Sequence, residues 1–145
     1  MIEFTLKDVE VPGLDSEFFV LWLQDVVKEE GFELGDICVV FCSDAELLEM
    51  NKTFLQHDYF TDILTFDYCF ESVVSGDLFL SIDRIVDNAI ALKEDYFKEL
   101  KRVCVHGVLH LCGYKDKTEK ETKIMRDKEE YYIAKFVPRE TQRKC

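Results

Sequence analysis

The stretch 103–117 (VCVHGVLHLCGYKDK) contains the side chains with the clearest capacity for chemistry. His106 and His110 are four residues apart, which places both imidazoles on one face of a helix, one turn from each other. Gly113 permits a sharp turn after that helix, so Asp116 can fold back toward the histidines. Two imidazoles and a carboxylate are a common ligand set for catalytic zinc, with a fourth position left open for water. The sequence therefore predicts one metal ion held by His106, His110 and Asp116.

The same pair of histidines has a second interpretation. A helical HxxxH pattern is weak evidence by itself, and either imidazole can instead be a hydrogen-bonded core side chain. Three features favour the metal site. The chain contains only three histidines and two of them form this pair, a glycine that can stop the helix follows, and an acid comes after the glycine.

A metal at this position predicts hydrolytic chemistry. A bound ion lowers the pKa of coordinated water to about 7 and stabilises charge on a phosphoryl or carbonyl oxygen. Proteases with the HExxH motif carry a glutamate general base directly after the first histidine. Here that position is Gly107, which disfavours peptide hydrolysis by this motif. The only catalytic group that the sequence assigns is therefore a metal-bound water.

The rest of the chain predicts the elements that must position these groups. Alternating and strongly apolar segments indicate strands, whereas apolar residues at helical spacing with capping residues indicate helices. The expected strands are residues 2–7, 32–42, 62–68 and 77–82, and the expected helices are residues 16–30, 44–55, 83–94, 96–112 and 118–136. Residues 71–76 (ESVVSG) read as a connection. This order predicts a single α/β (α+β) domain over residues 1–145, with a mixed sheet of about four strands covered by about five helices.

Length and composition agree with a single globular domain. The chain has 145 residues, of which 48% are hydrophobic, and this length can bury a core without disulfides. Its six cysteines include no CxxC pair and are expected to be mostly buried thiols. The N-terminus lacks a signal-peptide pattern, and no apolar run approaches the roughly 20 residues that span a membrane. A cytoplasmic protein without membrane contact is therefore expected.

The charge is distributed unevenly along the chain. The net charge of −12 argues against a polyanionic partner, because phosphate binding requires Lys and Arg. However, residues 1–100 carry 6 Lys and Arg against 23 Asp and Glu, whereas residues 101–145 carry 12 against 7. The basic excess thus coincides with the predicted metal site and is compatible either with an anion-attracting surface or with an ordinary solvated helix face.

Three segments in register resemble the YbeY-type endoribonucleases. Residues 106–116 (HGVLHLCGYKD) resemble the signature HGxLHLxGYDH of that family. Residues 51–54 (NKTF) with 61–66 (TDILTF) are similar to its segment N-x-x-[FY]-R…T-D-V-L-S-F. Residues 75–81 (SGDLFLS) are similar to its GDI-x-I-S strand, with Asn88 and Ala89 in the helix that follows. The resemblance covers roughly residues 35–130.

The resemblance implies a fold, a cofactor and a function. It implies a mixed α/β fold and one Zn²⁺ per chain held by three side chains, with other divalent metals left open. It also implies a single-strand-directed, metal-dependent endoribonuclease in ribosomal RNA maturation and ribosome quality control. The partners it implies are ribosomal RNA and the ribosome or ribosomal proteins, and neither DNA nor a membrane is expected.

The chain departs from the family pattern at two positions. The third metal ligand of the family is a histidine where this chain has Asp116, and a carboxylate is also a zinc ligand. The family has an arginine where this chain has Leu55, so a guanidinium that can bind phosphate is missing there.

Four residues are candidates for the substrate cleft. Thr61 and Asp62 match family positions at the start of a strand, where they either line the cleft or only cap the strand. Lys115 and Lys117 flank Asp116 and either supply positive charge near the metal or are solvated surface lysines. His57 matches no family motif and is expected to be a surface residue.

Two alternatives to the endoribonuclease remain open at the level of sequence. One is a metallohydrolase that acts on a substrate other than RNA. The other is a non-enzymatic ribosome-assembly or interaction protein with a structural metal, which the acidic net charge and Leu55 favour. An open coordination position favours an enzyme.

Overall fold

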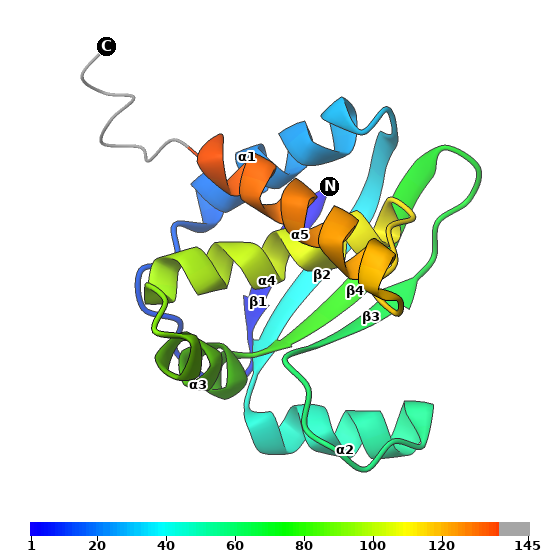
Figure 1. Cartoon of the computed structure of the whole chain (residues 1–145). Coiled ribbons are helices and arrows are strands. Elements are labelled where there is room, and N and C mark those ends of the chain that lie inside the picture. The colour runs from blue at the N-terminus through cyan, green and yellow to red at the C-terminus, as the bar shows by residue number, and fades with distance from the viewer. Residues whose placement is uncertain (137–145) are drawn as a thin grey trace.

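The computed structural model describes residues 1–136 and consists there of one mixed sheet and its covering helices (Figure 1). The elements in chain order are β1 (Ile2–Leu6), α1 (Ser16–Glu29), β2 (Glu33–Cys42), α2 (Asp44–Leu55), β3 (Ile63–Asp67), β4 (Val73–Ser81), α3 (Ile82–Leu92), α4 (Tyr96–Leu111) and α5 (Glu119–Ala134). This confirms the predicted α/β class, with four strands and five helices in the described part of the chain.

The strands lie in the order β1-β2-β4-β3. β1, β2 and β4 run parallel to one another, and β3 runs antiparallel to β4 at the edge. The antiparallel pair follows from a short connection, because parallel neighbours require a long crossover and antiparallel ones do not.

Helices cover the two faces of the sheet unequally. Successive side chains of a strand point to opposite faces, and in β2 this alternation separates two apolar clusters. Ile37, Val39 and Phe41 join the main core under α1, α4 and α5, whereas Cys42 packs with Leu47 of α2 on the opposite face. Figure 1 shows α4 and α5 on the side of α1, and α2 apart from them at the other side of the sheet.

Helix α4 is the central helix of the main layer. It begins at the N-cap Asp95, whose side chain accepts a hydrogen bond from the backbone N–H of Lys98. Gly107 faces the sheet so closely that an added Cβ would lie 2.7 Å from Ile63 Cδ1 and 2.8 Å from Leu78 Cδ1. The missing side chain therefore allows the helix to approach the sheet, next to the residues predicted to bind metal.

One predicted boundary is wrong. Residues 73–76, expected to belong to a connection, form the first part of β4. Val74 is 1% exposed and joins the main core, and Phe70 pairs with Val73 across a tight turn. Burial alternates along this segment, and its two valines favour a strand, so β4 begins at Val73 and pairs with β2. The prediction of a connection over residues 71–76 did not take this alternation into account.

The remaining expectations about composition are consistent with the described residues. Cys38, Cys42, Cys69, Cys104 and Cys112 are free thiols. Within residues 1–136, no helix has both the length and the apolarity that crossing a bilayer requires.

Candidate metal centre

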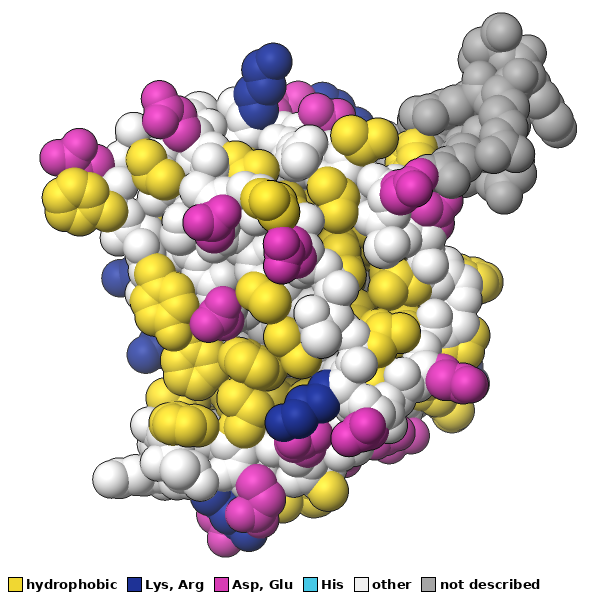
Figure 2. Space-filling model, turned by 180° about the vertical axis from the view of Figure 1, so that it is seen from behind, with side chains coloured by type: hydrophobic (Ala, Val, Ile, Leu, Met, Phe, Trp, Pro, Cys, Tyr) yellow, Lys and Arg dark blue, Asp and Glu magenta, His cyan; other side chains and the backbone are white. Residues whose placement is uncertain are grey.

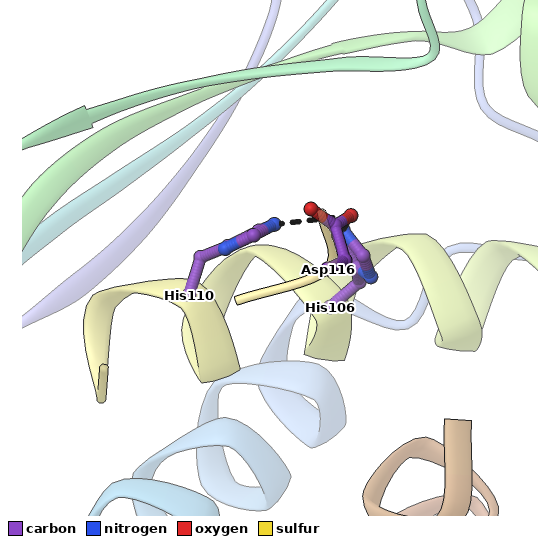
Figure 3. A group of neighbouring side chains, drawn as sticks. All are labelled: His106, His110 and Asp116. Carbon is purple, nitrogen blue, oxygen red and sulfur yellow. Dashed lines mark ion pairs between the residues drawn. The ribbon is translucent and has the colours of Figure 1, made fainter. Parts of the chain in front are cut away.

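Two helical histidines and one loop carboxylate point at a common spot. His106 and His110 lie one turn apart on α4, with ring centroids 4.5 Å apart. Asp116 Oδ2 is 3.2 Å from His106 Nε2 and 3.5 Å from His110 Nε2. Figure 3 shows the three side chains directed toward one another from the helix and the following loop. One ligand atom of each lies within 4.8 Å of the others, so tertiary structure brings the predicted set together.

The loop after α4 is folded back by a glycine turn. Gly113 has φ of +105°, a backbone conformation that residues with a side chain rarely adopt. Its N–H donates to His110 O at 3.0 Å, and the N–H of Tyr114 donates to Leu109 O at 3.1 Å. Further on, Thr122 Oγ1 donates to the backbone oxygen of Asp116 at 3.1 Å. Together these bonds hold the third candidate ligand against the helix.

The other ring nitrogen of each histidine is already occupied. His110 Nδ1 lies 2.9 Å from Tyr114 O, and His106 Nδ1 lies 2.6 Å from Glu129 Oε2. A carbonyl oxygen and an ionised carboxylate can only accept, so both Nδ1 atoms carry the hydrogen. In the neutral imidazoles the Nε2 atoms then present lone pairs to Asp116.

This donor set fits a cation. Two nitrogen lone pairs and a carboxylate oxygen that converge without a proton between them repel one another, and a positive ion removes that repulsion. Ligand atoms 2.0–2.1 Å from one tetrahedral ion are about 3.3 Å apart, which matches the 3.2 and 3.5 Å separations found here. The outer hydrogen bonds are those that orient metal-ligating histidines in proteins. The residues therefore can hold a metal ion.

A buried network of charged side chains contacts His106 through Glu129. Glu129 of α5 is 4% exposed, and its Oε1 lies 3.3 Å from Arg102 Nη1. Arg102 Nη2 donates to Glu130 at 2.7 Å, and its Nε lies 3.3 Å from Glu99 Oε1 without hydrogen-bond geometry. Because a buried carboxylate needs paired donors, Arg102 stabilises the charge of Glu129, which in turn fixes the ring of His106.

A cavity of about 420 Å³ opens beside the site. Its lining combines polar side chains, among them Asp62, Asn88, His106, Asp116 and Arg126, with apolar ones such as Leu92 and Met125. These residues come from α3, α4, α5, the residue before β3 and the loop between α4 and α5. Asp62 accepts a hydrogen bond from Asn88 Nδ2 at 3.3 Å, and burial raises the pKa of its carboxyl group. Two of the three candidate ligands, His106 and Asp116, therefore border a space that a substrate can enter, whereas His110 is not among the lining residues.

The pKa of His106 results from two opposed effects. Burial lowers it, whereas the hydrogen bond and charge of Glu129 and the charges of Asp116 and Asp62 raise it. The net pKa lies above the ordinary value of 6.5. In the metal-free protein the protonated imidazole is therefore favoured by folding.

This shift predicts opposite pH dependences with and without metal. In the metal-free protein, protonated His106 contributes stability below pH about 6.5 that is lost as pH rises through the raised pKa. A metal ion competes with that proton, so we expect the increase in Tm caused by added divalent metal to grow with pH. Thermal unfolding with chelator and with excess metal, from about pH 5.5 to about pH 8, measures both. A metal-induced increase in Tm that is the same at every pH would contradict the prediction.

One of the four predicted cleft residues lines the cavity. Asp62 lines it, whereas Thr61, Lys115 and Lys117 are not among the lining residues. Thr61 Oγ1 donates to Ile63 O at 3.3 Å, and both lysines are exposed. The cleft role of these four residues stays a prediction.

Leu55 and His57, the two other residues considered in the sequence analysis, are not among the residues that line the cavity. Leu55 ends α2 and is 43% exposed. His57 is exposed, stacks on Tyr59 with centroids 5.1 Å apart, and takes part in a 3.0 Å hydrogen bond with the Tyr59 hydroxyl. This agrees with a surface histidine.

Sequence reasoning missed Glu129. Its partner His106 is 23 residues away, and no local motif joins them. A signal was nevertheless present, because Met125, Glu129 and Tyr132 follow helical spacing and all three are buried on α5. A carboxylate within an apolar stripe indicates a buried partner.

Comparison with known proteins points to one family. The family model described as "Endoribonuclease YbeY" matches residues 2–137. A protein named Endoribonuclease YbeY from Phocaeicola vulgatus is 42% identical over 134 residues, covering 92% of this chain and 97% of its own. One of the same name from Bacteroides thetaiotaomicron is 43% identical over 133 residues, covering 92% and 97%.

A solved structure has the same fold. The solution structure of a Thermotoga maritima protein is similar, with a TM-score of 0.67 and 29% sequence identity, over 94% of this chain and 89% of that one. The structural similarity thus covers nearly all of this chain.

Proposed function

The chain belongs to the YbeY family of endoribonucleases, and from this premise we propose that it cleaves single-stranded RNA at a metal centre formed by His106, His110 and Asp116. The biological substrate in this proposal is ribosomal RNA during its maturation and the quality control of ribosomes. The protein would act in the cytoplasm, on the ribosome or with ribosomal proteins.

One observation carries the metal-dependent part of the proposal. The Nε2 atoms of His106 and His110 converge on one carboxylate oxygen of Asp116, while both Nδ1 atoms are engaged elsewhere. A purely structural ion pair does not require two oriented imidazoles. Three protein ligands leave a coordination position free for a substrate or water, as in catalytic sites.

The ligand types favour zinc. Two imidazoles and a carboxylate suit Zn²⁺, whereas Mg²⁺ and Ca²⁺ prefer oxygen ligands. One such site per chain is proposed, since His106, His110 and Asp116 form a single group within residues 1–136.

The residues around this site have different roles in the proposed reaction. Bound zinc would supply Lewis-acid stabilisation of a phosphoryl oxygen and acidify coordinated water. Glu129 and the backbone oxygen of Tyr114 keep the two imidazoles in the tautomer that leaves Nε2 free. Thr122 fixes the backbone at Asp116. Asp62, in the wall of the cavity, can accept a hydrogen bond from a substrate hydroxyl or water.

Surface charge favours RNA binding on the side of this site. The opposite face of the molecule presents many Asp and Glu among exposed hydrophobic side chains and few Lys or Arg (Figure 2). Phosphates are repelled by such a surface. Among the described residues, the segment 101–136 carries 9 Lys and Arg against 6 Asp and Glu, and it includes most of α4 and all of α5, which border the site.

Metal removal tests the proposal. We expect that chelation of the purified protein abolishes cleavage of a labelled single-stranded segment of ribosomal RNA, and that Zn²⁺ restores it because the ligand set selects zinc. The same strand annealed to its complement should remain intact. Metal content is measured on each sample, with Mg²⁺ addition as the control.

Two results would reject the proposal in different ways. Cleavage by protein shown to be free of metal would exclude metal-dependent chemistry at this site. Stoichiometric metal without cleavage of any RNA would support a structural metal in a ribosome-assembly protein.

A further inference from the structure

Only two guanidinium groups line the cavity beside the metal centre within the described residues, those of Arg102 and Arg126. They differ in environment. Arg102 is buried, with a side chain 7% exposed, and it is surrounded by Glu99, Glu129 and Glu130. Its positive charge is already balanced by these three carboxylates, so Arg102 has little capacity to bind a further anion.

Arg126 is the available cation of the cavity. Its side chain is 55% exposed, and its one recorded ion pair joins Nε to Glu129 Oε1 at 3.9 Å. That oxygen is also 3.3 Å from Arg102. The two terminal Nη groups of Arg126 have no recorded hydrogen bond or ion pair in the described structure, so a fork of donors remains for a ligand.

The placement of Arg126 on α5 aims it at the cavity. Thr122, Met125, Arg126 and Glu129 all line the cavity, and their spacing of three and four residues puts them on one face of the helix. On this face of α5, Thr122 bonds the backbone of Asp116 and Glu129 bonds the ring of His106. Arg126 lies between them in the helix and therefore borders the cavity beside the candidate metal site. A ligand in the cavity meets the metal site and this guanidinium together.

On the basis of the proposed function, we infer that Arg126 binds a phosphate of the RNA strand next to the scissile one, and that it supplies the positive charge absent at Leu55. A guanidinium matches two phosphate oxygens with two parallel N–H donors. The cavity otherwise presents carboxylates (Asp62, Glu99, Asp116 and Glu129), which repel RNA. A phosphate at the mouth thus requires a cation besides the metal.

Equilibrium binding of a fluorescein-labelled, 2′-O-methylated single-stranded RNA to the zinc-loaded full chain tests this inference. We expect Arg126→Ala to weaken binding about ten-fold and to reduce the slope of log Kd against log salt by about 0.7, the value for one phosphate contact on a single strand. Arg126→Lys should retain part of the affinity, because the charge stays but the paired donors are lost.

Lys120→Ala is the matched control. Lys120 is an exposed cation on the same helix, outside the cavity lining, and its replacement causes the same change in net charge. We expect it to change affinity less than about two-fold. Metal content and circular dichroism should be unchanged in all these variants, since none removes a candidate ligand.

The outcomes separate this inference from the proposed function. Equal binding by Arg126→Ala and Lys120→Ala, with wild-type cleavage intact, would overturn the role of Arg126 alone. Loss of affinity in Lys115→Ala/Lys117→Ala but not in Arg126→Ala would assign the phosphate contact to the loop lysines and also overturn it. A wild-type protein that neither binds nor cleaves single-stranded RNA would reject both the inference and the function on which it rests.

Discussion

Replacing His110 with Ala is expected to abolish both bound metal and RNA cleavage. The imidazole provides one of three converging ligand atoms, and two ligands do not hold zinc at a catalytic site. Loss of even an outer partner of a metal ligand costs 10–100-fold in metal affinity or activity, so loss of the ligand should lower cleavage by more than about 100-fold. Metal content by atomic absorption and cleavage of single-stranded RNA, measured on the same preparation, check this result.

His57→Ala is the control for a general effect of losing a histidine. His57 is the one histidine outside the site and is exposed, so its replacement should leave metal content and cleavage within about two-fold of wild type. Full metal loading of His110→Ala would show that the ion binds elsewhere. Cleavage retained by the metal-free variant would show that the site has no part in the reaction.

Replacing Glu129 with Gln is expected to have the second-largest effect, through a residue that binds no metal. One oxygen of Glu129 accepts from His106 Nδ1 at 2.6 Å and the other lies 3.3 Å from Arg102 Nη1. A glutamine has the same shape, but its NH₂ group must face one of these two donors. We expect zinc affinity to fall about 10–100-fold and stability to fall by about 1–3 kcal/mol, because a buried donor loses its acceptor.

This variant differs from a ligand variant in one measurable respect. Saturating zinc should restore much of the cleavage to Glu129→Gln, because all three ligands are present, but none to His110→Ala. Glu130→Gln is the matched control, since Glu130 also bonds Arg102 but is 47% exposed and does not touch the imidazole. Wild-type zinc affinity in Glu129→Gln, or an equal loss in Glu130→Gln, would show that Glu129 does not position His106.

The candidate site could be predicted from sequence where its geometry is local. The spacing of His106 and His110 fixes their common face in any α-helix, and Gly113 marks the place where the chain turns back. Asp116 then lies within reach of both imidazoles without knowledge of the rest of the fold. The comparisons confirm the family that the residues around these positions resemble.

The order of elements was also contained in the sequence. The change between strand and helix periodicity, together with capping residues such as Thr118, predicted each helix and strand that the described residues form. The exception is the start of β4 at Val73. The point where β4 begins depends on its partner β2, which pairs with Val73 and Val74. A short segment whose sequence fits either a loop or a strand becomes a strand when a neighbouring strand supplies hydrogen bonds.

Only tertiary structure determined what surrounds the candidate metal site. Glu129 reaches His106 across 23 residues, and Arg126 borders the cavity because α5 packs on α4. Helical spacing is fixed by local backbone geometry, whereas the packing of two helices is fixed by which apolar faces the whole chain buries. The sequence by itself therefore predicted the three candidate ligands that the structure brings together, while packing decided that Glu129 holds the ring of His106 and that Arg126 borders the adjacent cavity.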